Sequence, residues 1–370
     1  MHSTRVLGGV LLCIVARIMH VHVMQTNKKS EASPSLFHTQ QLRITLWPKL
    51  KILPTTMRAT AFKASATSSG SDQPPAILRP WIISYDACPK IFLPFTNVDF
   101  CYTLFSAALL ILVRYLSDAI FPSVLGWPRG ALITKESAAC AVSGLQASLF
   151  LPSLLMCLLS VPYRPCAKMS DSPIWWQSAA RALIQFCSGY MVYDSIMLVV
   201  STWDAENNRP GLSDGDFMFL GHHFATMMYM TTALVQGAGH QSAMILMLLG
   251  ESTSPLMNAN SILRFAVKVY TESTLVHTAL VWSEFIYALM YVPMRTFGGP
   301  LAALHLTIDL FATKKGREDC NVFLSVLWMP MCWGVLIGSI PWIKEGVEML
   351  SDGLVLKYHK DYDYGDAYEL

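Results

Sequence analysis

Charged residues are scarce in this 370-residue chain: only 14% are Asp, Glu, Lys or Arg, whereas 53% are hydrophobic. A typical soluble domain carries about 25% charged residues, so this chain has too few to cover a surface in water. Its uncharged blocks are long enough to cross a bilayer as helices, which takes roughly 20 residues. A large soluble all-α protein would instead show polar stripes at helical spacing. The composition therefore predicts a polytopic membrane protein.

The chain also lacks a Cys-x-x-Cys pair and a concentrated basic patch in its apolar body. Its formal net charge is +2, so we expect no nucleic-acid partner. The nine cysteines are scattered, which argues against a zinc ribbon and against a disulfide framework. We expect most of them to serve as small apolar packing residues in the membrane.

Residues 1–79 differ from the rest, because they hold ten Lys or Arg against two acids, Glu31 and Asp72. A first apolar run has the length of a signal-peptide core, and the Ser-rich basic part that follows resembles a transit peptide. Three interpretations stay open. The region is a targeting segment, or translation starts at Met57 rather than Met1, or the region is a disordered arm. In each case we expect it to lie outside the fold.

The hydrophobic blocks predict an all-α membrane bundle of about seven transmembrane helices around a polar central cavity, over residues 97–345. The piece 300–312 is too short to cross alone and is interpreted as an interfacial or re-entrant helix, or as an extension of the sixth span. Residues 346–370 form an acidic, Tyr-rich tail. Lys and Arg are spread evenly over alternate loops, so their count favours neither orientation. The predicted spans are 100–117, 137–161, 180–203, 217–236, 241–263, 274–296 and 321–343.

Four of these spans carry polar side chains, most of them three or four residues apart and hence on one helix face. Single Ser or Thr residues are explained by hydrogen bonds between helices. A buried acid is different, because burying it without a partner costs several kcal/mol. We therefore expect a polar pocket built from Tyr190 and Asp194, then His222, His223 and Thr226, then Glu251, Ser254, Pro255 and Asn258, and finally Glu284, Tyr287, Tyr291 and Arg295.

A metal site is not expected. Adjacent residues on a helix point about 100° apart, so His222 and His223 do not hold one ion together. The other histidines of the apolar body, His240, His277 and His305, show no His-x-x-x-His spacing. A pocket of His and acid residues instead suits a lipid headgroup, a proton relay or acid–base chemistry.

The order "GYMVYDSIM", "GHHFATMMY" and "GESTSPLMNANSIL" resembles the TLC domain, a family that includes ceramide synthases and translocating-chain-associating membrane proteins. The feature most specific to this family is an Asp in one span, a His-His pair at the start of the next span, and then Glu-x-x-x-Pro-x-x-Asn. The likeness covers roughly residues 97–345 and is greatest to the TLC domain-containing proteins of plants and animals. It implies six or more helices around a cavity open to lipid.

In the ceramide synthases, the paired histidines are implicated in acyl transfer from acyl-CoA to a sphingoid amine. That motif falls on His222 and His223, with Thr226 at the matching downstream position. The second half of the motif, a His-Asp followed by a further Asp, is absent. Gly250-Glu251 and Asn258 stand there instead, which argues against ceramide synthesis itself.

The first functional hypothesis is a membrane protein that binds or senses lipids and influences membrane lipid composition. The alternative is a lipid acyltransferase with acyl-CoA as substrate, and whether the protein is an enzyme stays open. A third hypothesis, a proton-relaying transporter, lacks the internal repeats common in transporters. The catalytic residues of an enzyme would be His222, His223, Asp194 and Glu251, and the lipid-binding residues Tyr190, Thr226, Ser254, Asn258, Glu284 and Arg295.

We expect no cofactor and no metal. The expected partners are membrane lipids and, as one option, a second copy of the chain in a homodimer. The expected location is the endoplasmic reticulum or another endomembrane, with the plastid envelope or plasma membrane as alternatives.

Overall fold

The computed structural model describes residues 73–93, 97–204 and 209–358. Most of them are helical, and β1 (Trp203–Asp204) pairs antiparallel with β2 (Arg209–Pro210). The all-α fold class predicted from the sequence is confirmed. The helices are α2 (Arg79–Ala87), α3 (Phe100–Val124), α4 (Leu132–Leu159), η1 (Met169–Asp171), α5 (Ile174–Ser201), α6 (Asp214–Gln236), α7 (His240–Glu251), α8 (Ser254–Val269), α9 (Thr274–Pro293), η2 (Met294–Gly298), α10 (Gly299–Ala312), α11 (Lys314–Asp319), α12 (Val322–Gly338) and α13 (Ile340–Tyr358).

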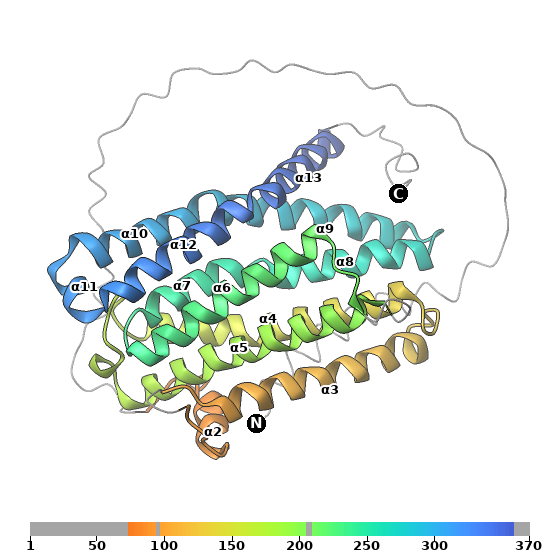
Figure 1. Ribbon diagram of the computed structural model, residues 1–370. Coiled ribbons are helices and arrows are strands. Elements are labelled where there is room, and N and C mark those ends of the chain that lie inside the picture. Colours follow the sequence, from red (N-terminus) through yellow and green to blue (C-terminus); the bar gives the residue numbers. More distant parts are fainter. Residues whose placement is uncertain (1–72, 94–96, 205–208, 359–370) are drawn as a thin grey trace, which may run out of the picture.

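Five helical stretches of the described chain are long and apolar enough to cross a membrane: α3, α4, α5, Thr274–Ala312 and Val322–Gly353. The predicted count of seven is thus not confirmed. Helix α6 has the length but carries polar residues such as His222 and His223, and the predicted fifth span is divided into α7 and α8. Helix α6 and the pair of α7 and α8 nevertheless run between the same two ends of the bundle as the neighbouring helices (Figure 1).

The short apolar piece 300–312 continues the sixth span. Helix α9 passes through the π-helix η2 directly into α10, so the three form one stretch of 39 residues. Of the roles considered for this piece, the structure shows the extension. A π-helix changes the direction of side chains within an otherwise regular helix and is often found at functional sites. This one carries Arg295.

The predicted fifth span breaks at Ser252 and Thr253, and Pro255 explains the break. Proline has no backbone N–H, and its ring clashes with the carbonyl four residues earlier, which here belongs to Glu251. Helix α7 ends at Glu251, and α8 begins at Ser254 with the proline in its first turn. Helix α4 runs along both α7 and α8, so the pair replaces one continuous helix in the bundle (Figure 1).

The core is centred on α5, against which α2, α3, α4 and α6 pack. Alanines 179, 180 and 182 with Leu183 and Ile184 are fully buried on successive faces of α5. Helix α3 comes closest at Gly189, where an added Cβ would lie 2.7 Å from both the Cβ of Ser106 and the carbonyl oxygen of Thr103. The α5 residues that follow, including Asp194, are positioned by this close packing.

The two predicted flanking regions are partly described. Leu78, at the end of region 1–79, is fully buried in the core. Residues 1–72 lie outside the described part of the chain. The interpretation of this region as a targeting segment therefore falls on residues that the structure does not describe. Residues 346–358 of the predicted tail belong to α13, whereas 359–370 also lie outside the described part.

Candidate functional site

A cavity of about 470 Å³ lies between α5, α6, the break between α7 and α8, and the end of α9 with η2. A mixture of acids, histidines, tyrosines and arginines faces it. Eight of the ten site residues predicted from the sequence line this cavity: Tyr190, Asp194, His222, His223, Glu251, Ser254, Asn258 and Arg295. The expected convergence of the polar helix faces is therefore found.

His223 is the most enclosed of the titratable side chains in the cavity, with 3% of its surface exposed. Its Nε2 lies 3.8 Å from Oδ2 of Asp194, and its Nδ1 shares a hydrogen bond of 3.2 Å with Oγ of Ser195. The ring of Phe219, one turn earlier on α6, packs on it at 4.1 Å between centroids. Three neighbours therefore hold the orientation of this imidazole.

Asp194 is linked to a second polar group on its own helix. The single hydroxyl proton of Tyr190 has two acceptors within reach, Oδ2 of Asp194 at 3.4 Å and Oγ of Ser143, on α4, at 3.0 Å. The spacing of four residues had predicted that Tyr190 and Asp194 share a face, and this contact confirms it. The carboxylate thus stands between the tyrosine and His223.

The break between α7 and α8 supplies the acid and amide of the opposite wall. Asn258 donates through its side-chain amide to the carbonyl of Ser254 at 2.7 Å, which occupies a carbonyl near the start of α8. The carboxyl group of Glu251 has Ser254 and Arg295 as polar neighbours. Because the helix is interrupted here, these side chains extend into the cavity from the helix ends.

Arg295 reaches the cavity from the π-helix η2. Its guanidinium donates to the carbonyl of Gly250 at 3.0 Å and stacks over the ring of Tyr291 at 5.4 Å. Its Nε is buried without a hydrogen-bond partner. Among the described residues, no carboxylate lies within ion-pair distance of Arg295. The cavity therefore contains a cation that the protein does not neutralise directly.

Two predicted site residues lie elsewhere. Glu284 does not line the cavity; it forms an ion pair of 3.0 Å with Arg264, which does. Thr226 lines a smaller pocket of about 80 Å³ next to the cavity. This pocket is mostly apolar, with Met and Leu side chains from α5, α6, α7 and α12, and it shares His222, Glu251 and Arg295 with the polar cavity.

Sequence reasoning missed several residues that line the cavity or contact its side chains. Ser195 directly follows Asp194 and so lies about 100° away on the helix, outside the predicted stripe. Arg264 was missed because its place at the cavity depends on its ion pair with Glu284, and that residue belongs to another helix. Trp342 and Glu345 line the cavity from α13, beyond the polar stripes considered. Within the described residues, no group of three or more His, Cys, Asp or Glu side chains is placed to hold a metal ion.

Residues 136–345 match the family model of the TLC domain. The chain belongs to the TLC domain family. The match covers more than half of the chain and includes all the cavity residues named above. No curated protein and no solved structure matches this TLC-domain chain. Together with its apolar helices, the family identifies an integral membrane protein with a lipid-related role.

Proposed function

We propose that this TLC-domain protein binds or senses membrane lipids through the polar cavity and thereby influences membrane lipid composition. The supporting observation is that the polar cavity lies directly beside the smaller apolar pocket. The cavity of about 470 Å³ and the smaller pocket lined by Met and Leu share five residues: Met191, His222, Gly250, Glu251 and Arg295. A lipid has the same two-part chemistry, with a polar headgroup and an apolar chain. The volume falls within the range of small-ligand sites, about 300–1,000 Å³.

Arg295 is the group proposed to contact the headgroup. Arg264 is the other arginine of the cavity, but its charge is balanced by Glu284 at 3.0 Å. Arg295 donates to a backbone carbonyl and stacks over Tyr291, and its acidic neighbour Glu251 lies beyond ion-pair distance. A guanidinium in this situation pairs strongly with a phosphate or carboxylate, because a charge-assisted hydrogen bond is about twice as strong as a neutral one. The headgroup expected here is therefore anionic or carries a phosphate.

The test compares Arg295→Gln with Lys315→Gln in nanodiscs of phosphatidylcholine that contain a fluorescent anionic phospholipid. Loss of a charged hydrogen bond is worth about 1.5–3 kcal/mol, so Arg295→Gln is expected to weaken binding about tenfold or more. Lys315, on the short helix α11 away from the cavity, serves as the control and should leave binding unchanged. Equal binding by wild type and Arg295→Gln would contradict the proposal. Lipid analysis after removal of the gene tests the effect on membrane composition.

The alternative function is a lipid acyltransferase with an acyl-CoA donor. The placement of His223 between Asp194 and Ser195 favours it, because an oriented imidazole is what a general base requires. In that reaction His223 takes the proton of an amine or hydroxyl nucleophile, which attacks the thioester carbonyl while the CoA thiol leaves. Asp194 holds the ring, as the acid of a catalytic triad does. The assay offers the purified protein acyl-CoA with sphingoid bases, lysophospholipids and simple amines in turn.

The proposed location is the endoplasmic reticulum or another endomembrane, with the plastid envelope and the plasma membrane as alternatives. A homodimer also stays a proposal. Microscopy of the full chain tagged at its C-terminus, with a marker for each compartment, tests the location. Cross-linking in native membranes tests the dimer.

A further inference from the structure

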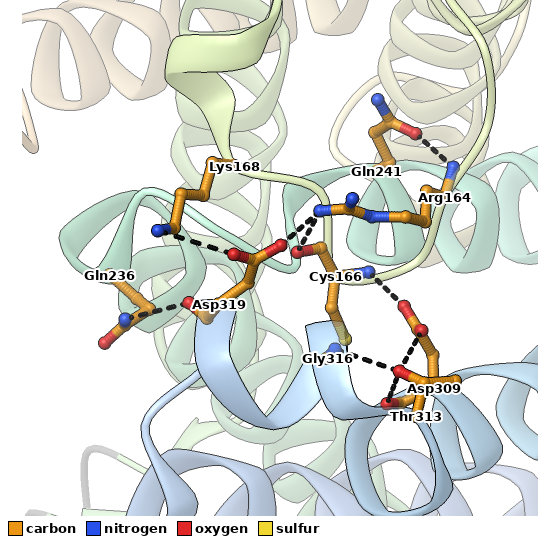
Figure 2. Close-up of polar contacts among 9 residues, drawn as sticks. All are labelled: Arg164, Cys166, Lys168, Gln236, Gln241, Asp309, Thr313, Gly316 and Asp319. Atoms are coloured by element: carbon orange, nitrogen blue, oxygen red, sulfur yellow. Dashed lines mark hydrogen bonds and ion pairs between the residues drawn. The ribbon is translucent and has the colours of Figure 1, made fainter.

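At one end of the bundle, the loop between α4 and α5 is tied to the last residue of α11 (Figure 2). The carboxylate of Asp319 accepts a hydrogen bond from the guanidinium of Arg164 and forms an ion pair of 3.4 Å with the Nζ of Lys168. The side-chain amide of Gln236, at the end of α6, donates to the carbonyl of Asp319 at 3.3 Å. Three separate segments therefore meet at one nearly buried aspartate.

A second set of contacts ties the same loop to α10. The backbone N–H of Cys166 donates to Oδ2 of Asp309 at 2.9 Å, and the hydroxyl of Thr313 donates to Oδ1 of Asp309 at 2.9 Å (Figure 2). The turn from α10 into α11 is tight, because an added Cβ at Gly316 would lie 1.9 Å from the carbonyl oxygen of Asp309. The position of Cys166 relative to α10 and α11 is therefore well determined.

These contacts place two cysteines together. Cys166 is fully buried and Cys320 is 4% exposed, and both belong to the same core cluster. Cys166 lies two residues after Arg164, and Cys320 directly follows the partner of Arg164, Asp319. The two thiols interact: the hydrogen bond with Cys320, together with burial, raises the pKa of Cys166, and the same hydrogen bond lowers the pKa of Cys320.

We propose that Cys166 and Cys320 form a disulfide bond, and that this end of the bundle faces an oxidising compartment. The oxidant is a protein disulfide of the thiol–disulfide oxidoreductase class. The thiolate of Cys320 attacks that disulfide and releases one thiolate of the oxidoreductase. The deprotonated sulfur of Cys166 then attacks Cys320 and releases the second. One S–S bond forms here and one breaks in the oxidoreductase, which keeps the two electrons, and two protons move from Cys166 and Cys320 to its thiolates or to solvent.

A second cysteine pair lies at the same end of the bundle. Cys88 follows α2, Cys101 is in the first turn of α3, and their thiols also interact. In Figure 1, α2, the start of α3 and α11 are all at the end where α4 joins α5. The other four described cysteines, Cys140, Cys157, Cys187 and Cys332, lie within long apolar helices. Thiol pairs on one side only are expected of a chain with one oxidising face, because disulfides persist in such compartments.

The test uses the full chain in its native membrane. Free thiols are blocked with N-ethylmaleimide as the cells are lysed, and the protein is digested without reductant and mapped by mass spectrometry. We expect a linked pair of peptides that contain Cys166 and Cys320 and that separate on reduction. In Cys166→Ser, the link should disappear and Cys320 should carry the maleimide. The matched control Cys187→Ser, on a buried cysteine of α5, should keep the link.

The wild-type map alone decides the proposal, even if Cys166→Ser folds poorly. Maleimide on both Cys166 and Cys320 in unreduced wild-type protein would overturn it and would place this end of the bundle in a reducing compartment. Neither cysteine lines the lipid cavity, so this result leaves the proposed lipid binding untouched.

Discussion

The imidazole of His223 on α6 is held by two consecutive residues of α5: Nε2 lies 3.8 Å from Oδ2 of Asp194, and Nδ1 lies 3.2 Å from Oγ of Ser195. Consecutive residues of a helix point about 100° apart, so they reach the two nitrogens of one ring from different sides. The Asp194 contact is longer than a hydrogen bond, but a negative charge on this side favours the proton at Nε2, which leaves Nδ1 to accept the hydroxyl proton of Ser195. This arrangement couples the tautomer of the ring to the charge of the carboxylate.

Replacement of Asp194 by Asn tests that coupling. Asn keeps the shape and the contact with Tyr190 but removes the negative charge, so it also frees the tautomer of His223. We expect binding of the fluorescent anionic lipid to change about tenfold, the size of a charged hydrogen bond, with the protein still folded. Asp118→Asn is the control, because Asp118 pairs with Arg114 outside the cavity and should leave affinity unchanged.

Replacement of His222 or His223 by Gln separates lipid binding from catalysis. Loss of a general base lowers turnover about 10²- to 10⁴-fold, whereas a binding site has no turnover to lose. We expect the substitutions to alter lipid affinity and no ceramide to form from acyl-CoA and sphingoid bases. His305→Gln, which replaces a ring packed edge to face against Tyr163 outside the cavity, is the control. Robust N-acylation that depends on His222 or His223 would establish the acyltransferase instead.

Gly189 is predicted to be essential for the packing of α3 on α5. An alanine there would place its Cβ 2.7 Å from the Cβ of Ser106, and overpacking of this kind costs about 1–3 kcal/mol. Gly221, on α6, has no atom within 4 Å of an added Cβ. Gly221→Ala should be neutral or stabilising, because alanine favours helix by up to about 1 kcal/mol over glycine. Thermal unfolding in detergent, followed by tryptophan fluorescence, measures the Tm of Gly189→Ala and of Gly221→Ala. Equal Tm values for the two variants would contradict the packing argument.

Gly239 is predicted to be more sensitive than Gly237, although both have a positive φ, of 79° and 67°. Any L-residue in this conformation costs about 1–2 kcal/mol. An alanine at 239 would also meet the buried ring of Trp328 at 2.6 Å, whereas one at 237 would meet nothing within 4 Å. Gly239→Ala should therefore lower the Tm further than Gly237→Ala does. The reverse order in the same unfolding measurement would refute the role of Trp328.

Local spacing was enough to predict part of the site. Tyr190 with Asp194 on α5, and Ser254 with Asn258 on α8, are one turn apart, and helix geometry alone places each pair on one face. Arg264, by contrast, could not be assigned, because its position depends on Glu284 of the neighbouring helix. Trp342 and Glu345 were missed for the same reason, since they reach the cavity only through the packing of α13.

The sequence by itself determined that this is a helical membrane protein, because a chain with so few charges and such long apolar blocks has to satisfy its backbone hydrogen bonds within each segment in lipid. It placed Pro255, whose missing N–H acts locally, inside one continuous span over 241–263, and the structure divides that span into α7 and α8. Only the tertiary structure decided which polar faces meet in one cavity, that Arg295 enters it without an ion pair, and that Cys166 lies beside Cys320. These relationships join segments far apart in the chain, and they are set by the close packing of helices around α5 rather than by any local preference.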